Sequence, residues 1–298
     1  RACFMGGFQD QPVNNTSFNT IDYITISSAG NAQDFGDCTT KIFDGASSIS
    51  SRTRQFAYMG RIGGPNFSYT NKIEFITYST KGNGTDFGDA TTSVGGYQPA
   101  GASNATRGVR AGGSNNPSTG GVNVIEYITM AAEGNAVDFG DLTTAKLRYG
   151  SGVSSPTRGI FLWGHNHPAY VNVMEYITIA TTGNAQDFGD LIEAVGGGMA
   201  CENSTRAIAT AKDGDLTQSI QISTLGNATN FGTLSVTRNQ VSMTSSPTRG
   251  IAAGGGNPNY LNVIDYLSIQ TEGKAVDFGD LTVNRQTDNA GSNAHGGL

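Results

Sequence analysis

The chain repeats one chemically suggestive tetrapeptide, Asp-Phe-Gly-Asp, five times, and the first copy lies at residues 34–37. In protein kinases Asp-Phe-Gly binds magnesium, but there it occurs once and works with a glycine-rich loop, a strand lysine and a catalytic loop. None of these companions is recognisable in this sequence. A catalytic site also needs one convergent set of groups, whereas a recurring motif is spread along the molecule. We therefore interpret the motif as structural.

The wider pattern around the motif, GNAxDFGD, suits a tight turn that leads into a strand. Gly and Asn tolerate positive φ, and we expect the first aspartate to accept backbone N–H groups in an Asx turn. The phenylalanine is expected to pack between neighbouring repeats. Calcium is the alternative interpretation, because Asp34 and Asp37 offer oxygens close together and Ca²⁺ takes about six to eight of them. No other cofactor is indicated.

Histidine and cysteine supply the remaining candidates for metal chemistry. His165 and His167 are two residues apart, so in an extended segment both imidazoles would face one side and could hold a metal. Two ligands do not complete a site and no third is evident nearby, so we predict no metal site. Cys3, Cys38 and Cys201 have no metal-ligand spacing and are expected to be buried thiols. A bridge between the first two stays open as an alternative.

Composition excludes several classes of partner. The 298 residues include 18 Lys+Arg against 24 Asp+Glu, a net charge of -6, so we expect no basic surface for nucleic acid or anionic membranes. Charged residues make up 14%, and the 42 glycines with abundant Ser, Thr and Asn predict a polar, largely uncharged surface. No apolar run reaches the roughly 18 residues of a membrane span. Because the chain opens at Arg1 without methionine, we expect a processed product or part of a longer chain.

The elements that carry these residues form a repeat, marked by the phenylalanine of the motif. Before each phenylalanine lies a segment of alternating apolar and polar residues, such as residues 172–179 (NVMEYITI), typical of a half-buried strand. A shorter apolar strand that starts with arginine and ends in glycine precedes it, as at residues 158–164 (RGIFLWG). The phenylalanines recur every 43 to 52 residues, at Phe35, Phe87, Phe139, Phe188, Phe231 and Phe278.

Each unit therefore predicts four short strands, the last of them rich in Ser, Thr and Gly and leading to the next arginine. Helical periodicity is absent, and the many glycines would penalise helices. Four-stranded units of this size stack radially as propeller blades. We predict an all-β fold, a six-bladed β-propeller of four-stranded antiparallel blades, as a single domain over residues 1–298 with repeats of about 49 residues.

The two ends of the chain are expected to close this ring together. Arg1 occupies the same repeat position as Arg249, and the next equivalent position falls at His295. Because the chain begins at the second strand of a blade, the missing first strand should come from residues 284–294. Pairing of this C-terminal strand with the N-terminal strand would leave no open sheet edge.

An arginine recurs beside each apolar strand, and an acid recurs in the alternating strands. A guanidinium group presents a fork of donors, so we expect the arginines to bond backbone carbonyls or the strand acids and to serve stability rather than binding. The arginines are Arg54, Arg107, Arg158, Arg206 and Arg249, and the acids are Asp22, Glu74, Glu126, Glu175 and Asp265.

With an arginine, an apolar strand ending in Gly-Gly, an aromatic after an acid, and an aromatic in a turn, the chain resembles kelch-type propeller repeats. The resemblance covers all six units, with phenylalanine where those repeats usually have tryptophan. The fifth unit departs, because Gln218 and Ser219 replace the acid and the aromatic and residues 230–233 read NFGT. The segment YITIATTGNAQDFGDL also looks like repeat proteins of marine bacteriophages, which implies a virion or tail-fibre component.

Ligand binding is expected where the blades differ, on the loops between the arginine-led strand and the alternating strand. Strand alternation should place all six loops on one face of the ring. Aromatic rings with amides, hydroxyls and little charge suit an uncharged polar ligand such as a glycan. The candidate ligand-binding residues are Phe67, Tyr69, Trp163, His165, His167, Tyr170, Asn257 and Tyr260.

Three functions follow from this pattern, in order of preference. The first is a non-enzymatic bacteriophage virion component, associated with the tail or fibre, that contacts other virion proteins and a host-surface glycan or receptor. The second is a secreted or cell-surface lectin-like module. The third is a glycan-cleaving enzyme, disfavoured because propeller sialidases and copper sugar oxidases gather their catalytic groups in one pocket, whereas the arginines here recur once per blade. We expect no catalytic residues, and a location in the virion or outside the cell.

Overall fold

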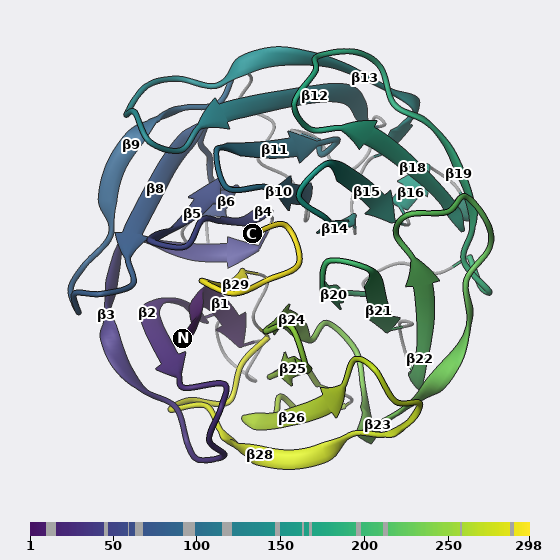
Figure 1. Ribbon diagram of the computed structural model, residues 1–298. Coiled ribbons are helices and arrows are strands. Elements are labelled where there is room, and N and C mark those ends of the chain that lie inside the picture. The colour runs from purple at the N-terminus through teal and green to yellow at the C-terminus, as the bar shows by residue number, and fades with distance from the viewer. Residues whose placement is uncertain are drawn as a thin grey trace.

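The repeated segments fold into small antiparallel sheets arranged around one axis (Figure 1). The computed structural model describes residues 1–9, 16–44, 47–58, 60–62, 68–91, 99–114, 121–146, 150–162, 164–166, 169–194, 198–210, 214–256, 258–286 and 289–298. These residues contain strands and no helix, and they form the predicted six-bladed β-propeller. In this part of the chain no helix is long and apolar enough to cross a membrane.

Each blade has the same order from the axis outward: an inner strand, an arginine strand, an alternating strand and an outer strand that carries the Asp-Phe-Gly-Asp motif or its equivalent. Blade 1 consists of β29 (Ala290–Ser292), β1 (Ala2–Gln9), β2 (Thr16–Ile24) and β3 (Gln33–Asp44). Blade 2 consists of β4 (Ser47–Ser50), β5 (Arg54–Tyr58), β8 (Lys72–Thr77) and β9 (Thr85–Asp89). Blade 3 consists of β10 (Ala100–Ser103), β11 (Arg107–Ala111), β12 (Val122–Thr129) and β13 (Val137–Lys146).

The second half of the ring repeats this order. Blade 4 consists of β14 (Ser151–Ser154), β15 (Arg158–Leu162), β18 (Val173–Thr178) and β19 (Gln186–Asp190). Blade 5 consists of β20 (Ala200–Glu202), β21 (Arg206–Thr210), β22 (Gly214–Gln221) and β23 (Thr229–Arg238). Blade 6 consists of β24 (Ser242–Ser245), β25 (Arg249–Ala253), β26 (Val263–Ser268) and β28 (Val276–Asp280).

The ring closes as predicted, because β29 pairs antiparallel with β1 and Ala2 lies opposite Ser292. One detail of the prediction was wrong. In the other blades the inner strand ends four residues before the arginine, so the residue equivalent to Arg1 is Gly296 rather than His295. The chain after β29 does not continue into another strand but turns toward the axis, where Figure 1 places its C-terminal end.

Short strands that the sequence analysis did not predict lie outside the four-stranded pattern. The hairpin of β6 (Arg61–Ile62) and β7 (Ser68–Tyr69) pairs with β3 of the preceding blade. A second hairpin, of β16 (Gly164–Asn166) and β17 (Ala169–Val171), follows the arginine strand of blade 4. β27 (Gly273–Lys274) pairs parallel with β23 and links blade 6 to blade 5. Runs of two or three residues are too short to produce a readable alternation.

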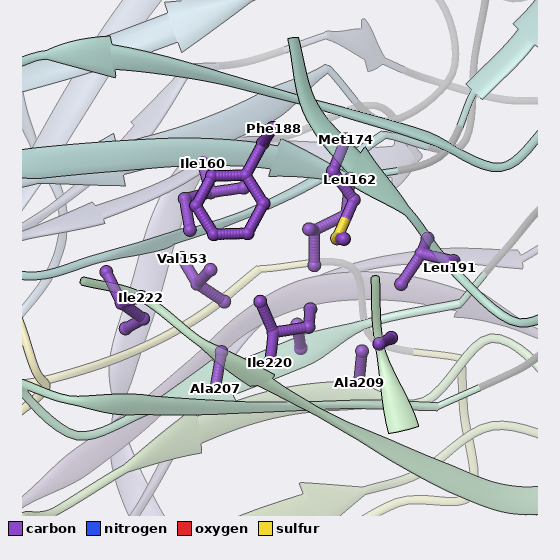
Figure 2. Packing of buried hydrophobic residues seen from close by; sticks show 12 residues of the cluster. Val153, Ile160, Leu162, Met174, Phe188, Leu191, Ala207, Ala209, Ile220 and Ile222 are labelled. Atoms are coloured by element: carbon purple, nitrogen blue, oxygen red, sulfur yellow. The ribbon is translucent and has the colours of Figure 1, made fainter. Parts of the chain in front are cut away.

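The apolar core lies between blades rather than inside them. Figure 2 shows one cluster, in which Ile160 and Phe188 of blade 4 pack with Ala207 and Ile220 of blade 5. Comparable clusters fill the other five junctions. The motif phenylalanine is 2–3% exposed in all six units, so its predicted packing between blades is confirmed.

Candidate functional site

The Gly-Asn turn of one blade docks on the Asp-Phe-Gly-Asp strand of the blade before it. At the junction of blades 1 and 2, the amide of Gly82 donates to the carbonyl of Phe35 (3.0 Å), and the amide of Gly84 donates to the carbonyl of Asp37 (2.8 Å). The amide of Asp37 donates to Oδ1 of Asn83 (3.0 Å). Asparagine accepts in the same way at four further junctions, through Asn31, Asn135, Asn184 and Asn227. The side-chain acceptor is thus the asparagine, where we expected the first aspartate.

The glycine of the motif is required by the close approach of this turn. A Cβ atom built on Gly36 would lie 2.4 Å from the carbonyl oxygen of Gly82, and Gly36 has a φ of +150°. The corresponding distances for Gly88 and Gly140 are 2.4 Å and 2.5 Å. Recurrence of Asp-Phe-Gly-Asp therefore reflects a repeated backbone contact: the phenylalanine fills the junction, and the glycine admits the neighbouring turn.

The acids of the alternating strands also belong to the junctions. Asp265 accepts hydrogen bonds from the amide (3.1 Å) and the hydroxyl (2.6 Å) of Ser235 in the preceding blade. Asp22 accepts from the hydroxyl of Thr282 (2.7 Å) in the same way. Equivalent bonds from threonine reach Glu74, Glu126 and Glu175. A buried carboxylate with such donors is an inter-blade tie.

Buried arginines that the sequence analysis did not single out accompany three of these acids. Nη2 of Arg238 lies 3.2 Å from Oδ2 of Asp265, and Nη1 of Arg285 lies 3.1 Å from Oδ2 of Asp22. Arg110 pairs with Glu126 at 2.7 Å. Burial lowers the pKa of Arg238 and of Arg285, and the facing carboxylate opposes that shift. Each pair is desolvated, so losing one partner would leave an uncompensated buried charge.

The recurring arginines bond carbonyls of the next blade. Nη1 of Arg158 donates to the carbonyl of Ile222 (2.7 Å), and its guanidinium lies 4.6 Å from the ring centre of Tyr176. The carbonyl alternative of our prediction is confirmed and the pairing with strand acids is wrong, because those acids face the preceding blade. The same bonding recurs for Arg1, Arg54, Arg107, Arg206 and Arg249.

The cysteines and the motif aspartates show no metal site within the described residues. Asp34 and Asp37, the first pair considered for calcium, are both exposed. The described part of the chain contains no group of three or more His, Cys, Asp or Glu that could hold a metal ion. Cys3, Cys38 and Cys201 are buried and unbridged, as predicted, and burial raises the pKa of each thiol.

The strand order is the same in every blade, so the loops between the arginine strands and the alternating strands leave the ring on one side. We call this side the loop face. His165 and Tyr170 lie opposite each other in the hairpin of β16 and β17, with ring centres 4.8 Å apart. His165 is 7% exposed and Tyr170 39% exposed, so the tyrosine covers the histidine and presents its own ring to solvent.

The other predicted loop residues are distributed around the ring. Tyr69 lies opposite Arg61 in the hairpin of blade 2 and is half-buried. Tyr260 of blade 6 meets Phe8 of blade 1 edge to face, with ring centres 5.7 Å apart, and Phe8 was not among the predicted residues. Phe67, Trp163, His167 and Asn257 lie outside the described residues. Among the candidates within the described residues, the structure brings together His165 and Tyr170.

No protein-family model matches the chain, and the search of curated proteins gives no match either.

Proposed function

We propose that the chain is a non-enzymatic structural component of a bacteriophage particle, associated with the tail or fibre, whose loop face contacts a glycan of the host surface. The resemblance of its repeats to phage virion proteins supports this assignment. A surface with 14% charged residues and abundant hydroxyls and amides suits a glycan, because such ligands are bound by stacking and neutral hydrogen bonds.

One observation carries the non-enzymatic part of the proposal: the recurring reactive residue types are already occupied by contacts between blades. Arg158 bonds the carbonyl of Ile222, and Asp22 bonds Thr282 and Arg285. Residues engaged in this way hold the ring together and are not arranged around one reacting centre. Among the described residues of the loop face, Tyr170 is an aromatic side chain with 39% of its surface exposed, and we assign recognition to it and to the underlying His165.

A glycan array probed with the wild-type chain and with Tyr170→Ala tests the binding step. We expect saturable binding by the wild type and roughly a five- to 150-fold loss in the variant, since stacking of a ligand ring on one aromatic is worth roughly 1–3 kcal/mol. Leu225→Ala, another exposed apolar side chain (57% exposed) in a turn between the alternating and outer strands, is the matched control and should leave binding unchanged.

The same array distinguishes the other functions. Release of reducing sugar from a bound glycan would replace the proposal with a glycan-cleaving enzyme. Mass spectrometry of purified particles together with immunogold labelling tests virion association. Binding by a protein that is absent from particles would instead support the secreted lectin-like module, and absence of both binding and virion association would refute the proposal.

A further inference from the structure

The inner strands surround an axial channel whose wall breaks the repeat at one position. The last residue of the inner strand is serine in five blades and glutamate, Glu202, in blade 5. The serine hydroxyls bond round the ring from strand to strand: Ser103 Oγ donates to the carbonyl of Ser50 (3.0 Å), and Ser50 Oγ donates to the carbonyl of Ser292 (2.9 Å). Ser245 Oγ donates to the carbonyl of Glu202 (2.6 Å). These residues are at most 7% exposed.

Glu202, the one residue of this ring that is not serine, faces His295 of the C-terminal segment. Oε1 of Glu202 accepts from Ser154 Oγ (3.2 Å) and lies 3.3 Å from Nδ1 of His295. Nε2 of His295 lies 2.9 Å from the carbonyl oxygen of Ser50 across the channel, so Nε2 carries the donated proton. His295 is 8% exposed and thus bridges blade 5 to blade 2 at the mouth of the channel.

The two residues after His295 fit the mouth only as glycines. A Cβ atom on Gly296 would lie 2.2 Å from the carbonyl oxygen of Asn203. A Cβ atom on Gly297 would lie 1.8 Å from the carbonyl oxygen of Ser103 and 2.9 Å from the hydroxyl of Ser154. A cavity of about 60 Å³ remains beneath the segment, lined by the inner strands and by His295. The acceptors around the imidazole therefore favour histidine at position 295, and the close carbonyls favour glycine at the next two positions.

We propose that the mouth of the axial channel is a binding site for a short peptide with a histidine followed by two glycines, and that residues 293–298 of this chain occupy it. The ring supplies a carboxylate and a carbonyl for the imidazole and two backbone carbonyls against which only glycine fits. Tethering keeps the segment at an effective concentration on the order of millimolar, so a peptide in solution competes poorly until the segment is displaced.

Gly297→Ala in the full chain displaces the segment, because the added methyl would meet the Ser103 carbonyl. A fluorescent, C-terminally amidated peptide of sequence NAHGGL, added to this variant, should bind one per chain with a Kd at least tenfold lower than for the wild-type chain. Peptides NAAGGL and NAHGAL are matched controls, each expected to bind at least tenfold more weakly. Adding Glu202→Ala to the variant should weaken binding of NAHGGL by a similar factor.

Equal binding of the three peptides, or no binding by a variant that keeps its β-sheet circular dichroism, would overturn the proposal. If Gly297→Ala fails to fold, His295→Ala displaces the segment without a clash and takes the same peptides. A segment that only caps the ring would lower the melting temperature without creating a saturable site, and hydrogen exchange adds an independent readout. The amide of Gly297, which is buried in the wild type, should be protected there and should exchange at least tenfold faster in His295→Ala.

Discussion

The contact between Gly36 and Gly82 offers a sharp test of how the blades are joined, because its two glycines differ in one respect only. Both have nearly the same positive φ, +150° and +152°. A Cβ atom on Gly36 would lie 2.4 Å from the Gly82 carbonyl oxygen, whereas a Cβ atom on Gly82 meets nothing within 4 Å. Gly36→Ala therefore adds backbone strain and a clash, and Gly82→Ala adds backbone strain alone.

The expected magnitudes follow from these distances. An ordinary contact begins at 3.4 Å, so the two blades must separate by about 1 Å at Gly36→Ala, against the hydrogen bond from the Gly82 amide to Phe35. Backbone strain of this kind costs about 1–3 kcal/mol, and overpacking costs about 1–3 kcal/mol more. Gly36→Ala should thus lose about 2–6 kcal/mol of the free energy of unfolding, against about 1–3 kcal/mol for Gly82→Ala.

Urea denaturation and thermal melting of the two variants measure the difference. The clash alone should place the melting temperature of Gly36→Ala about 2–6 °C below that of Gly82→Ala, at roughly 2 °C for each kcal/mol in a chain of this size. Equal losses in the two variants would show that the carbonyl of the neighbouring blade does not limit this position, and our explanation of the recurring motif would fail.

Three further predictions concern the junctions and the core. Arg158→Ala should lower the free energy of unfolding by about 1–3 kcal/mol through loss of the bond to Ile222, with glycan binding unchanged; unchanged melting with lost binding would contradict this. Gln218→Glu alone should destabilise the chain, because Ile192 offers only its amide to this residue. Ile192→Thr should restore part of that loss. A double-mutant cycle should therefore give a coupling of about 0.5–3 kcal/mol, and zero coupling would count against this pairing. Burial raises the pKa of Cys3 from 9.0 to about 12, so the thiol should resist Ellman's reagent near neutral pH. Stability should also fall as the pH rises from about 9 toward 12, since only the unfolded thiol ionises there, and rapid labelling of the folded chain would oppose both expectations.

The hydrogen bond between Ile192 and Gln218 accounts for the departure of the fifth unit from the repeat. At four other junctions a threonine or serine hydroxyl donates to an acid of the next blade, as at Thr282 and Asp22. At the junction of blades 1 and 2, Thr39 donates its amide to Glu74, and Lys72 lies 3.5 Å from the same carboxylate. At the junction of blades 4 and 5, Ile192 supplies only its amide, which donates to Oε1 of Gln218 at 2.9 Å. Because Gln218 is neutral, no ionised carboxylate faces Ile192, whose side chain has no hydroxyl to donate. The junction rather than the blade is therefore the unit within which residues depend on one another.

The repeat made the architecture predictable, because one register supplied the strand order and the closing strand at once. Pairing of a strand from residues 284–294 with the N-terminal strand followed from counting units, although the count missed the position equivalent to Arg1 by one residue. Burial of the phenylalanines followed from their period. The partner of each arginine could not be predicted from the repeat, because every unit offers both backbone carbonyls and a strand acid as acceptors for a guanidinium group. The pairing of Arg285 with Asp22 was out of reach for another reason: it joins residues far apart in the chain and occurs outside the recurring motif.

A ring of six near-equal junctions limits where specific recognition can arise. Equal junctions present the same groups six times around the axis, so by themselves they cannot select one orientation of a ligand. Selection requires residues that break the repeat, and the described residues place two such sets at different positions. Tyr170 over His165 breaks it on the loop face, in the hairpin of β16 and β17. Glu202 and His295 break it at the axis, where the inner strands end in five serines and one carboxylate, and that carboxylate faces the imidazole. Exchanging Glu202 for serine would restore the repeat and should remove the preference for histidine while leaving the six blades in place.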